Sequence, residues 1–349
     1  MTDRTEEVYA CLLCGSTGAV LYPRVKDCLF GTQGEFGERE CPACGLIWLS
    51  PRPVRDDLAR FYEQYYTHDS PADDSHLEKN PRLLGGLRDS VRSMVFCGYF
   101  GYKQVHTPHQ WCRLGGALGR IPLVRLRATS ELKELIPVYK RDGLLVDIGC
   151  GRGDFLVAMK RLGWNVLGVE SDPASSAIAQ RRGLTVQRVP FEQAEIPEES
   201  VDHITMNHVI EHFYDPIAVV KKCYRLLKIG GTVSLYAPNS QSLGRKRFGE
   251  HWLALDPPRH LYTWSRATMR TLLERGAFTD ITTKTFARLA GGIYDTSTVL
   301  GQGVVTRGRT PPPQRGRRLF AWREALLCSL GFPVGEEVLA LAVKHDGES

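Results

Sequence analysis

Two pairs of closely spaced cysteines near the start of the chain could bind a metal ion. Cys11 and Cys14 form one C-x-x-C pair, Cys41 and Cys44 form the other, and a glycine follows each pair. A C-x-x-C turn places two thiolates on one side of an ion, and the glycine permits the tight turn. Two such turns complete the tetrahedral shell of four thiolates that zinc prefers, with no coordination position left open. We therefore predict a structural Zn²⁺ on these four cysteines.

A glycine-rich loop in the middle of the chain could bind a nucleoside. An apolar run ends in Gly149, Gly151 and Gly153 and precedes a helical pattern. The spacing G-x-G-x-G differs from the dinucleotide fingerprint G-x-G-x-x-G, but it still lets a ligand approach the backbone closely. Asp147 stands before the loop and suits a positively charged ligand. Glu170 ends the next predicted strand, where a carboxylate can accept both ribose hydroxyls. The combination predicts a nucleoside cofactor.

Several histidines are candidates for a general base, because the pKa of histidine lies near neutral pH. His208, Glu211 and His212 follow a predicted strand, and ligands bind at such strand ends in an open α/β sheet. His260 follows two prolines and Arg259 on a loop that could cap the site, and it is our first choice. Glu211 and His212 could instead order the site, and each histidine could be a hydrogen-bonded structural residue. Arg259 could bind an acidic substrate or be an ordinary exposed arginine.

Four segments resemble class I S-adenosylmethionine-dependent methyltransferases, namely VDIGCGRGDF, LGVESDP, VDHITMNHVIEHFYDP and RLLKIGGTVSLYAPN. The resemblance covers about residues 140–285 and is closest to the group of ubiquinone-biosynthesis-type O-methyltransferases. The cysteine pairs followed by CGLIWLSPRP resemble a bacterial subgroup with an N-terminal zinc-binding segment, associated with polysaccharide or secondary-metabolite biosynthesis.

The resemblance assigns parts of S-adenosylmethionine to particular residues. It implies that Glu170 holds the ribose, that Phe191 borders the adenine, and that Asn207 and His208 lie beneath the sulfonium. The residues it places along the methionine part are Asp147, Gly149, Gly151 and Gly153.

The elements that must position these residues alternate between strands and helices from Leu144 onward, as in a doubly wound sheet. We predict an α/β fold: a Rossmann-like doubly wound sheet with a small N-terminal zinc ribbon and a helical insert. The expected domains are the ribbon at 1–50, a basic helical linker or lid at 51–142, and the methyltransferase domain at 143–349. The helix at 217–227 is expected to close at Gly230 and Gly231. The segment between the two cysteine pairs is predicted to be a β-hairpin.

Two basic stretches have open roles. Residues 81–127 carry many arginines, aromatics and glycines, and they are predicted to form a substrate lid or a solvated helical spacer. The Pro- and Arg-rich stretch 306–318 is predicted to be a mobile loop.

Composition narrows the class of protein. The 349 residues include 45 Lys and Arg against 39 Asp and Glu, a net charge of +6 that is compatible with anionic partners but too weak to indicate nucleic acid. The sequence contains no apolar run long enough for a transmembrane helix. The polar N-terminus is unlike a secretory signal, so we expect a cytoplasmic protein. Ten cysteines in a reducing compartment favour metal ligands over disulfides, and the six outside the quartet are expected to be buried apolar fillers.

These observations favour an enzyme that transfers a methyl group from S-adenosylmethionine to a small-molecule or glycan acceptor, by O-methylation. The alternative is an RNA-modifying methyltransferase that grips phosphates with the ribbon and the basic insert. The ribbon argues against RNA, because between Cys11 and Cys44 three basic residues stand against four acidic ones. A non-catalytic scaffold that keeps the fold is a third alternative, which the intact glycine loop disfavours.

Overall fold

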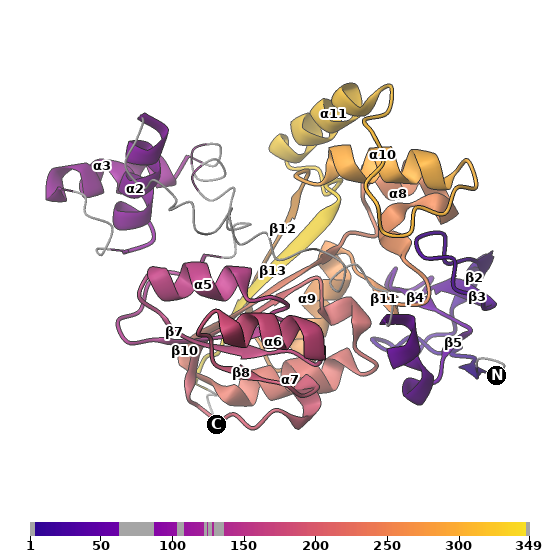
Figure 1. Ribbon diagram of the computed structural model, residues 1–349, viewed down its shortest axis with the longest axis horizontal. Coiled ribbons are helices and arrows are strands. Elements are labelled where there is room, and N and C mark those ends of the chain that lie inside the picture. Colours follow the sequence, from indigo (N-terminus) through magenta and orange to yellow (C-terminus); the bar gives the residue numbers. More distant parts are fainter. Residues whose placement is uncertain are drawn as a thin grey trace. The chain divides into compact units, whose positions relative to one another are not determined.

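The computed structural model describes residues 4–62, 87–102, 108–121, 124, 128 and 136–346 (Figure 1). The chain divides into two compact units. The first unit comprises residues 1–68, 206–225 and 232–349, and the second comprises residues 69–205 and 226–231. The cysteine quartet and the candidate histidines belong to the first unit, whereas the glycine loop and Glu170 belong to the second.

A seven-stranded sheet has the order β12-β13-β10-β9-β6-β7-β8. β6 and β7 are parallel with Ile148 opposite Val169, and β8 is parallel to β7. β13 is antiparallel to both of its neighbours. The predicted α/β class with a parallel-rich sheet is confirmed. The strands are β6 (Leu144–Ile148), β7 (Asn165–Val169), β8 (Val186–Gln187), β9 (Val201–Asn207), β10 (Leu227–Pro238), β12 (Asp280–Phe286) and β13 (Glu337–Val343).

The core of the second unit forms where apolar strands meet amphipathic helices. β6 reads LLVDI and is buried along nearly its whole length, as expected for a strand covered on both faces. Helix α5 (Asp154–Arg161) buries Leu156 and Met159 against it. Helix α6 (Pro173–Arg181) begins at Asp172, whose side chain accepts a hydrogen bond from the Ser175 amide at 2.7 Å.

The predicted end of one helix is wrong. Helix α7 (Pro216–Leu226) stops before the two glycines, and both lie inside β10. The reason is close backbone packing: a Cβ on Gly231 would lie 2.7 Å from the carbonyl oxygen of Lys228 and 3.1 Å from that of Val201. Glycine therefore serves strand packing here and not helix termination.

The N-terminal segment is a small β-unit, as predicted. β2 (Ala19–Val25) and β3 (Phe36–Glu40) form the expected antiparallel hairpin between the two cysteine pairs. The sheet continues through β4 (Ile47–Leu49) to β11 (Tyr262–Thr263), a strand from far along the chain, and Figure 1 shows this side-by-side arrangement. β1 (Thr5–Glu6) pairs with β5 (Arg52–Pro53). The domain boundaries at residues 50 and 142 stay a prediction.

The middle block contains a helical hairpin and a disulfide. Helices α2 (Leu87–Gly98) and α3 (His109–Gly119) pack together, and Cys97 is bonded to Cys112. The expectation that all six remaining cysteines are fillers is therefore wrong for this pair. Close helix contact explains the bond, because a Cβ on Gly98 would overlap the Cys112 carbonyl. Much of the predicted lid, including residues 81–86 and 103–107, lies outside the described residues.

The remaining described helices have between three and 13 residues. Within the predicted helical linker at 51–142, residues 55–62 form a 3-10 helix, η1 (Arg55–Tyr62). Residues 306–316 form no regular element, and the last two residues of that predicted loop begin α11. Within the described ranges, none of the helices is long and apolar enough to cross a membrane. The other helices are η3 (Phe191–Gln193), η4 (Ile210–His212), α8 (Leu243–Phe248), η5 (Gly249–His251), η6 (Leu253–Leu255), α9 (Arg266–Arg275), α10 (Ala290–Leu300) and α11 (Arg317–Ser329).

Candidate functional site

The four predicted metal ligands come together at one point. Their sulfur atoms all lie within 4.8 Å of one another, with Cys11 Sγ 3.5 Å from Cys44 Sγ and Cys14 Sγ 3.4 Å from Cys41 Sγ. Each C-x-x-C pair forms a tight turn in which the amide of the following glycine donates to the carbonyl of the first cysteine, at 2.8 and 2.9 Å. Both glycines have positive φ, near +75°. Four convergent thiols suit zinc, whose presence here stays a prediction.

The glycine loop is tied to the next strand and leaves its middle open. The Gly149 amide donates to the Val169 carbonyl at 2.8 Å, and Gly153 begins α5 with φ +80°. A Cβ on Gly151, at φ +53°, would meet no atom within 4 Å. A ligand can therefore approach the backbone at this residue.

Glu170 is fixed beside that opening. Its Oε2 accepts a hydrogen bond from the Gly151 amide and its Oε1 accepts one from the Asp172 amide, both at 2.8 Å. Burial raises the pKa of this carboxyl, against the effect of its hydrogen bonds with the backbone. The two amides hold the carboxylate in one orientation at the end of β7, as a ribose-binding residue requires.

The other predicted cofactor residues have different surroundings. Asp147 is buried, and its Oδ1 accepts a hydrogen bond from Thr205 Oγ1 at 2.5 Å. Phe191 is buried in η3. Asn207 ends β9 in the first unit, where its Oδ1 is buried and has no hydrogen-bond partner. An unpaired buried acceptor is costly, and this oxygen has the capacity to accept a further hydrogen bond.

The candidate catalytic residues gather around a buried carboxylate. Glu211 is 0% exposed, and neither of its oxygens has a hydrogen-bond partner. His208 Nδ1 lies 3.4 Å and His260 Nε2 lies 3.9 Å from Glu211 Oε1. The rings of His212 and His260 are 4.8 Å apart between centroids. Glu211, His212 and His260 each offer a possible ligand atom within 4.8 Å of the others, so this cluster is the second place suited to a metal ion in the described part of the chain.

The three histidines differ in protonation. Burial acts to lower the pKa of His208, but the ion pair with Glu211 at 3.4 Å and the hydrogen bond with Glu337 raise it to about 9. Burial lowers the pKa of His212 to about 4 and also lowers that of His260. At neutral pH His208 is therefore a cation, whereas His212 and His260 are neutral and able to accept a proton.

Backbone carbonyls orient the two neutral imidazoles. His260 Nδ1 lies 2.8 Å from the Ala254 carbonyl, and His212 Nδ1 lies 3.0 Å from that of Arg259. A proton on His260 Nδ1 satisfies its carbonyl, so the lone pair is on Nε2. The hydroxyl of Tyr62, from a distant segment, lies 2.8 Å from His212 Nδ1. The sequence gives no signal for this contact.

Arg259 is not an exposed residue that binds substrate. Its side chain is 0% exposed and donates to both oxygens of Asp27, at 2.8 and 3.0 Å, and to Asp256 at 3.0 Å. The guanidinium lies 4.7 Å from the ring centroid of Phe30. The expectation of a substrate anchor is wrong because two buried carboxylates from different segments neutralise it. Arg259 instead joins the loop that carries His260 to the N-terminal ribbon.

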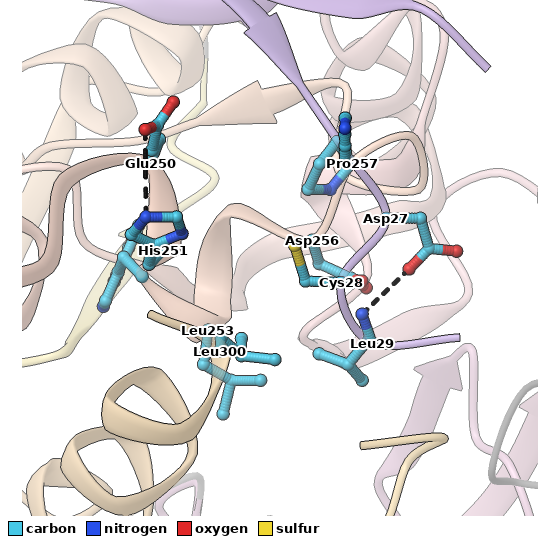
Figure 2. A pocket seen from close by; sticks show the side chains of 11 residues that line it. Asp27, Cys28, Leu29, Glu250, His251, Leu253, Asp256, Pro257 and Leu300 are labelled. Atoms are coloured by element: carbon cyan, nitrogen blue, oxygen red, sulfur yellow. Dashed lines mark hydrogen bonds and ion pairs between the residues drawn. The ribbon is translucent and has the colours of Figure 1, made fainter. Parts of the chain in front are cut away.

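A small pocket lies beside this ion-pair cluster. Figure 2 shows that it is lined by residues of two stretches, 26–29 and 250–257, together with Leu300. It leaves about 10 Å³ for the centre of a water-sized molecule, which is room for about one water. It is too small for a nucleoside or for a methyl acceptor.

The segment that contains the glycine loop matches known methyltransferases. Residues 123–283 match a family described as a methyltransferase domain. The ubiquinone biosynthesis O-methyltransferase of Cereibacter sphaeroides is 32% identical over 130 residues, which are 35% of this chain and 53% of the relative. The enzyme of the same name from Leptothrix cholodnii is 36% identical over 111 residues, 29% and 47% of the two chains. The chain thus spans about half the length of the curated relatives it matches.

Two solved structures are also similar. A methyltransferase dependent on S-adenosylmethionine from Archaeoglobus fulgidus has a TM-score of 0.43 at 18% identity, covering 63% of this chain and 94% of its own. A possible histamine N-methyltransferase from Thermotoga maritima has a TM-score of 0.43 at 22% identity, covering 68% and 98%. These likenesses are too loose to indicate a substrate.

The sequence matches, together with the sheet and its glycine loop, define a class of protein. The chain carries a class I S-adenosylmethionine-dependent methyltransferase domain. The curated relatives that it matches are O-methyltransferases by name.

Proposed function

We propose that this chain transfers a methyl group from S-adenosylmethionine to a hydroxyl of a small-molecule or glycan acceptor. The observation that carries the proposal is the pairing of the open Gly151 backbone with Glu170, held by the Gly151 amide at 2.8 Å. This pair fits a nucleoside: the glycine admits the ligand, and the fixed carboxylate accepts the ribose hydroxyls. The names of the curated relatives support oxygen as the atom methylated.

S-adenosylmethionine, when bound, supplies a methyl group on a sulfonium that is already activated. The residues of the chain must bind the nucleoside, orient the acceptor and remove its proton. Asp147, the three loop glycines and Glu170 are proposed for the first task, with Phe191 at the adenine and Asn207 near the sulfonium. His260 is proposed as the general base, because the Ala254 carbonyl fixes its tautomer and leaves Nε2 able to accept a proton.

The remaining histidines and Glu211 have supporting roles in this proposal. His208 is a cation at neutral pH and so acts as a donor and not as a base. Glu211 is deprotonated, because burial acts to raise its pKa but the ion pair with His208 and the nearby His212 and His260 lower it. The carboxylate lies 3.9 Å from His260 Nε2, so its negative charge stabilises positive charge on that imidazole after proton transfer. The net charge of +6 supports an anionic acceptor, and we propose that the cysteine quartet binds zinc as a structural ion.

Replacing Glu170 with alanine is expected to weaken the binding of S-adenosylmethionine and S-adenosylhomocysteine by about 2–4 kcal/mol, or about 30- to 900-fold. The reason is the loss of two hydrogen bonds to a charged acceptor. Gly151→Val should also weaken binding, because its side chain enters the space open to the ligand. Titration calorimetry measures both effects.

The exposed Glu192, which lies in η3 beside Phe191, provides the control. Glu192→Ala should leave the affinity unchanged. Equal affinity of wild type and Glu170→Ala would show that the ribose is bound elsewhere.

His260→Ala is expected to lower kcat by about 10²- to 10⁴-fold while leaving the affinity for S-adenosylmethionine unchanged, because general bases contribute that much to proton transfer. Release of S-adenosylhomocysteine with a panel of phenolic and sugar acceptors gives the rate. His251→Ala is the matched control, since His251 lies nine positions earlier and is 43% exposed.

A wild-type kcat in His260→Ala would show that His260 is not the general base. The same panel of methyl acceptors should include a tRNA pool. Methylation of tRNA in preference to every small acceptor would favour the RNA-modifying alternative.

A further inference from the structure

Helix α11 exposes an apolar stripe that nothing in the described structure covers. Leu319, Trp322, Leu326 and Leu330 are 69%, 64%, 42% and 65% exposed, and Phe332 just beyond the helix is 52% exposed. Their spacing of three, four and four residues places the first four on one side of a helix with 3.6 residues per turn. A contiguous apolar surface of this kind marks an interaction site.

The opposite side of α11 is the one that packs on the protein. Phe320 lies 5.0 Å from Tyr294 of α10 between ring centroids, and Glu324 is 0% exposed and accepts a hydrogen bond from the Glu336 amide at 2.9 Å. Figure 1 shows α11 lying against α10. The inner contacts fix the helix, so the outward stripe is a built feature of the fold and not a frayed end.

Positive charge surrounds the stripe. The segment 306–332 contains six arginines and a single acid, which is the buried Glu324. Arg318 and Arg323 are exposed on the helix, and Arg315 is exposed just before it. Arg317, which is half-buried, forms an ion pair with Asp295 at 3.2 Å. A helix that lies in a membrane interface typically has Leu and Trp on one face and arginines beside them.

We propose that α11 docks the protein on an anionic membrane surface, with the stripe inserted at the level of the lipid headgroups. A second copy of this chain fits less well, because a face-to-face contact would bring the arginines of both copies together. The helix has 13 residues, about 20 Å at 1.5 Å per residue, so it can lie in the interface without crossing the bilayer. This inference does not depend on methyl transfer.

The test is flotation of the full chain with vesicles of phosphatidylcholine alone or of phosphatidylcholine with one quarter phosphatidylglycerol. Wild type should bind the anionic vesicles and release as salt rises from about 50 to about 500 mM, because the charge term is screened. The double variant Leu319→Ser/Trp322→Ser should bind the anionic vesicles at least about tenfold more weakly than wild type, since it loses the inserted apolar area. Arg318→Glu/Arg323→Glu should lose the preference for phosphatidylglycerol.

The matched control is Trp111→Ser/Leu114→Ser in α3, the same two residue types at the same spacing, 45% and 44% exposed. It should bind as wild type does. Because all the altered side chains are exposed, circular dichroism should show unchanged folding. Equal binding of both vesicle types, equal loss in the control, or a dimer that the α11 variant alone dissociates in light scattering would overturn the proposal.

Discussion

Cys14→Ser is expected to release the bound zinc and unfold the N-terminal ribbon. A structural zinc site supplies on the order of 10 kcal/mol of apparent folding free energy in small domains. The hairpin between the cysteine pairs is short, and the pairing of β4 with β11 supports only one side of the ribbon, so loss of the ion should loosen the two cysteine turns first. Elemental analysis should fall from one Zn²⁺ per chain to none, and limited proteolysis should cut first between residues 11 and 44.

The control for that experiment is Cys328→Ser. Cys328 lies in α11, is half-buried and is not part of the cluster, so the zinc content and the protease pattern should not change. Freshly purified wild-type protein that contains no zinc, prepared without chelators, would show that the quartet is not a zinc site.

Arg259→Met is expected to lower the free energy of unfolding by about 3–5 kcal/mol, because it leaves Asp27 and Asp256 buried without their cation. The effect should reach the candidate base His260, since it follows Arg259 directly in the chain and packs against His212, which the Arg259 carbonyl orients. Urea denaturation measures the stability, and kcat against KM measures the second effect. We expect kcat to fall more than the affinity for S-adenosylmethionine.

An exposed ion pair provides the comparison. Arg4 lies 3.2 Å from Asp57, but its side chain is 65% exposed. Arg4→Met should therefore leave the urea midpoint nearly unchanged. A similarly small change for Arg259→Met would mean that the buried carboxylates take up protons or water at little cost.

Much of the fold could be predicted because its determinants are local. Three features are each determined by residues that are adjacent in the sequence: the apolar run of β6, the glycine loop after it and the carboxylate that follows β7. The cysteine pairs are equally local, so the hairpin between them was predicted. Gly231 shows the limit of prediction from local sequence. A glycine is needed there for close contact within the sheet, but the same local pattern also occurs where a helix ends.

The parts of the site that could not be predicted rest on contacts between distant segments. Asp27 and Arg259 are 232 positions apart, and Tyr62 and His212 are 150 apart. Neither pair has a spacing rule that could reveal it. The same holds for protonation: three histidines near one carboxylate look alike in the sequence, yet an ion pair with Glu211 and a hydrogen bond with Glu337 make His208 a cation while burial keeps the others neutral.

The shared sheet of β4 and β11 limits how this protein can be divided or recombined. Trp48 pairs with Tyr262, the Leu49 amide donates to the Leu261 carbonyl at 3.0 Å, and Arg275 donates to the Leu13 carbonyl at 2.7 Å. A fragment that ends near residue 143 would lose these partners and expose the edge of β4, and exposed edge strands promote aggregation. A ribbon transferred to another protein should therefore keep its fold only when residues 254–263 travel with it.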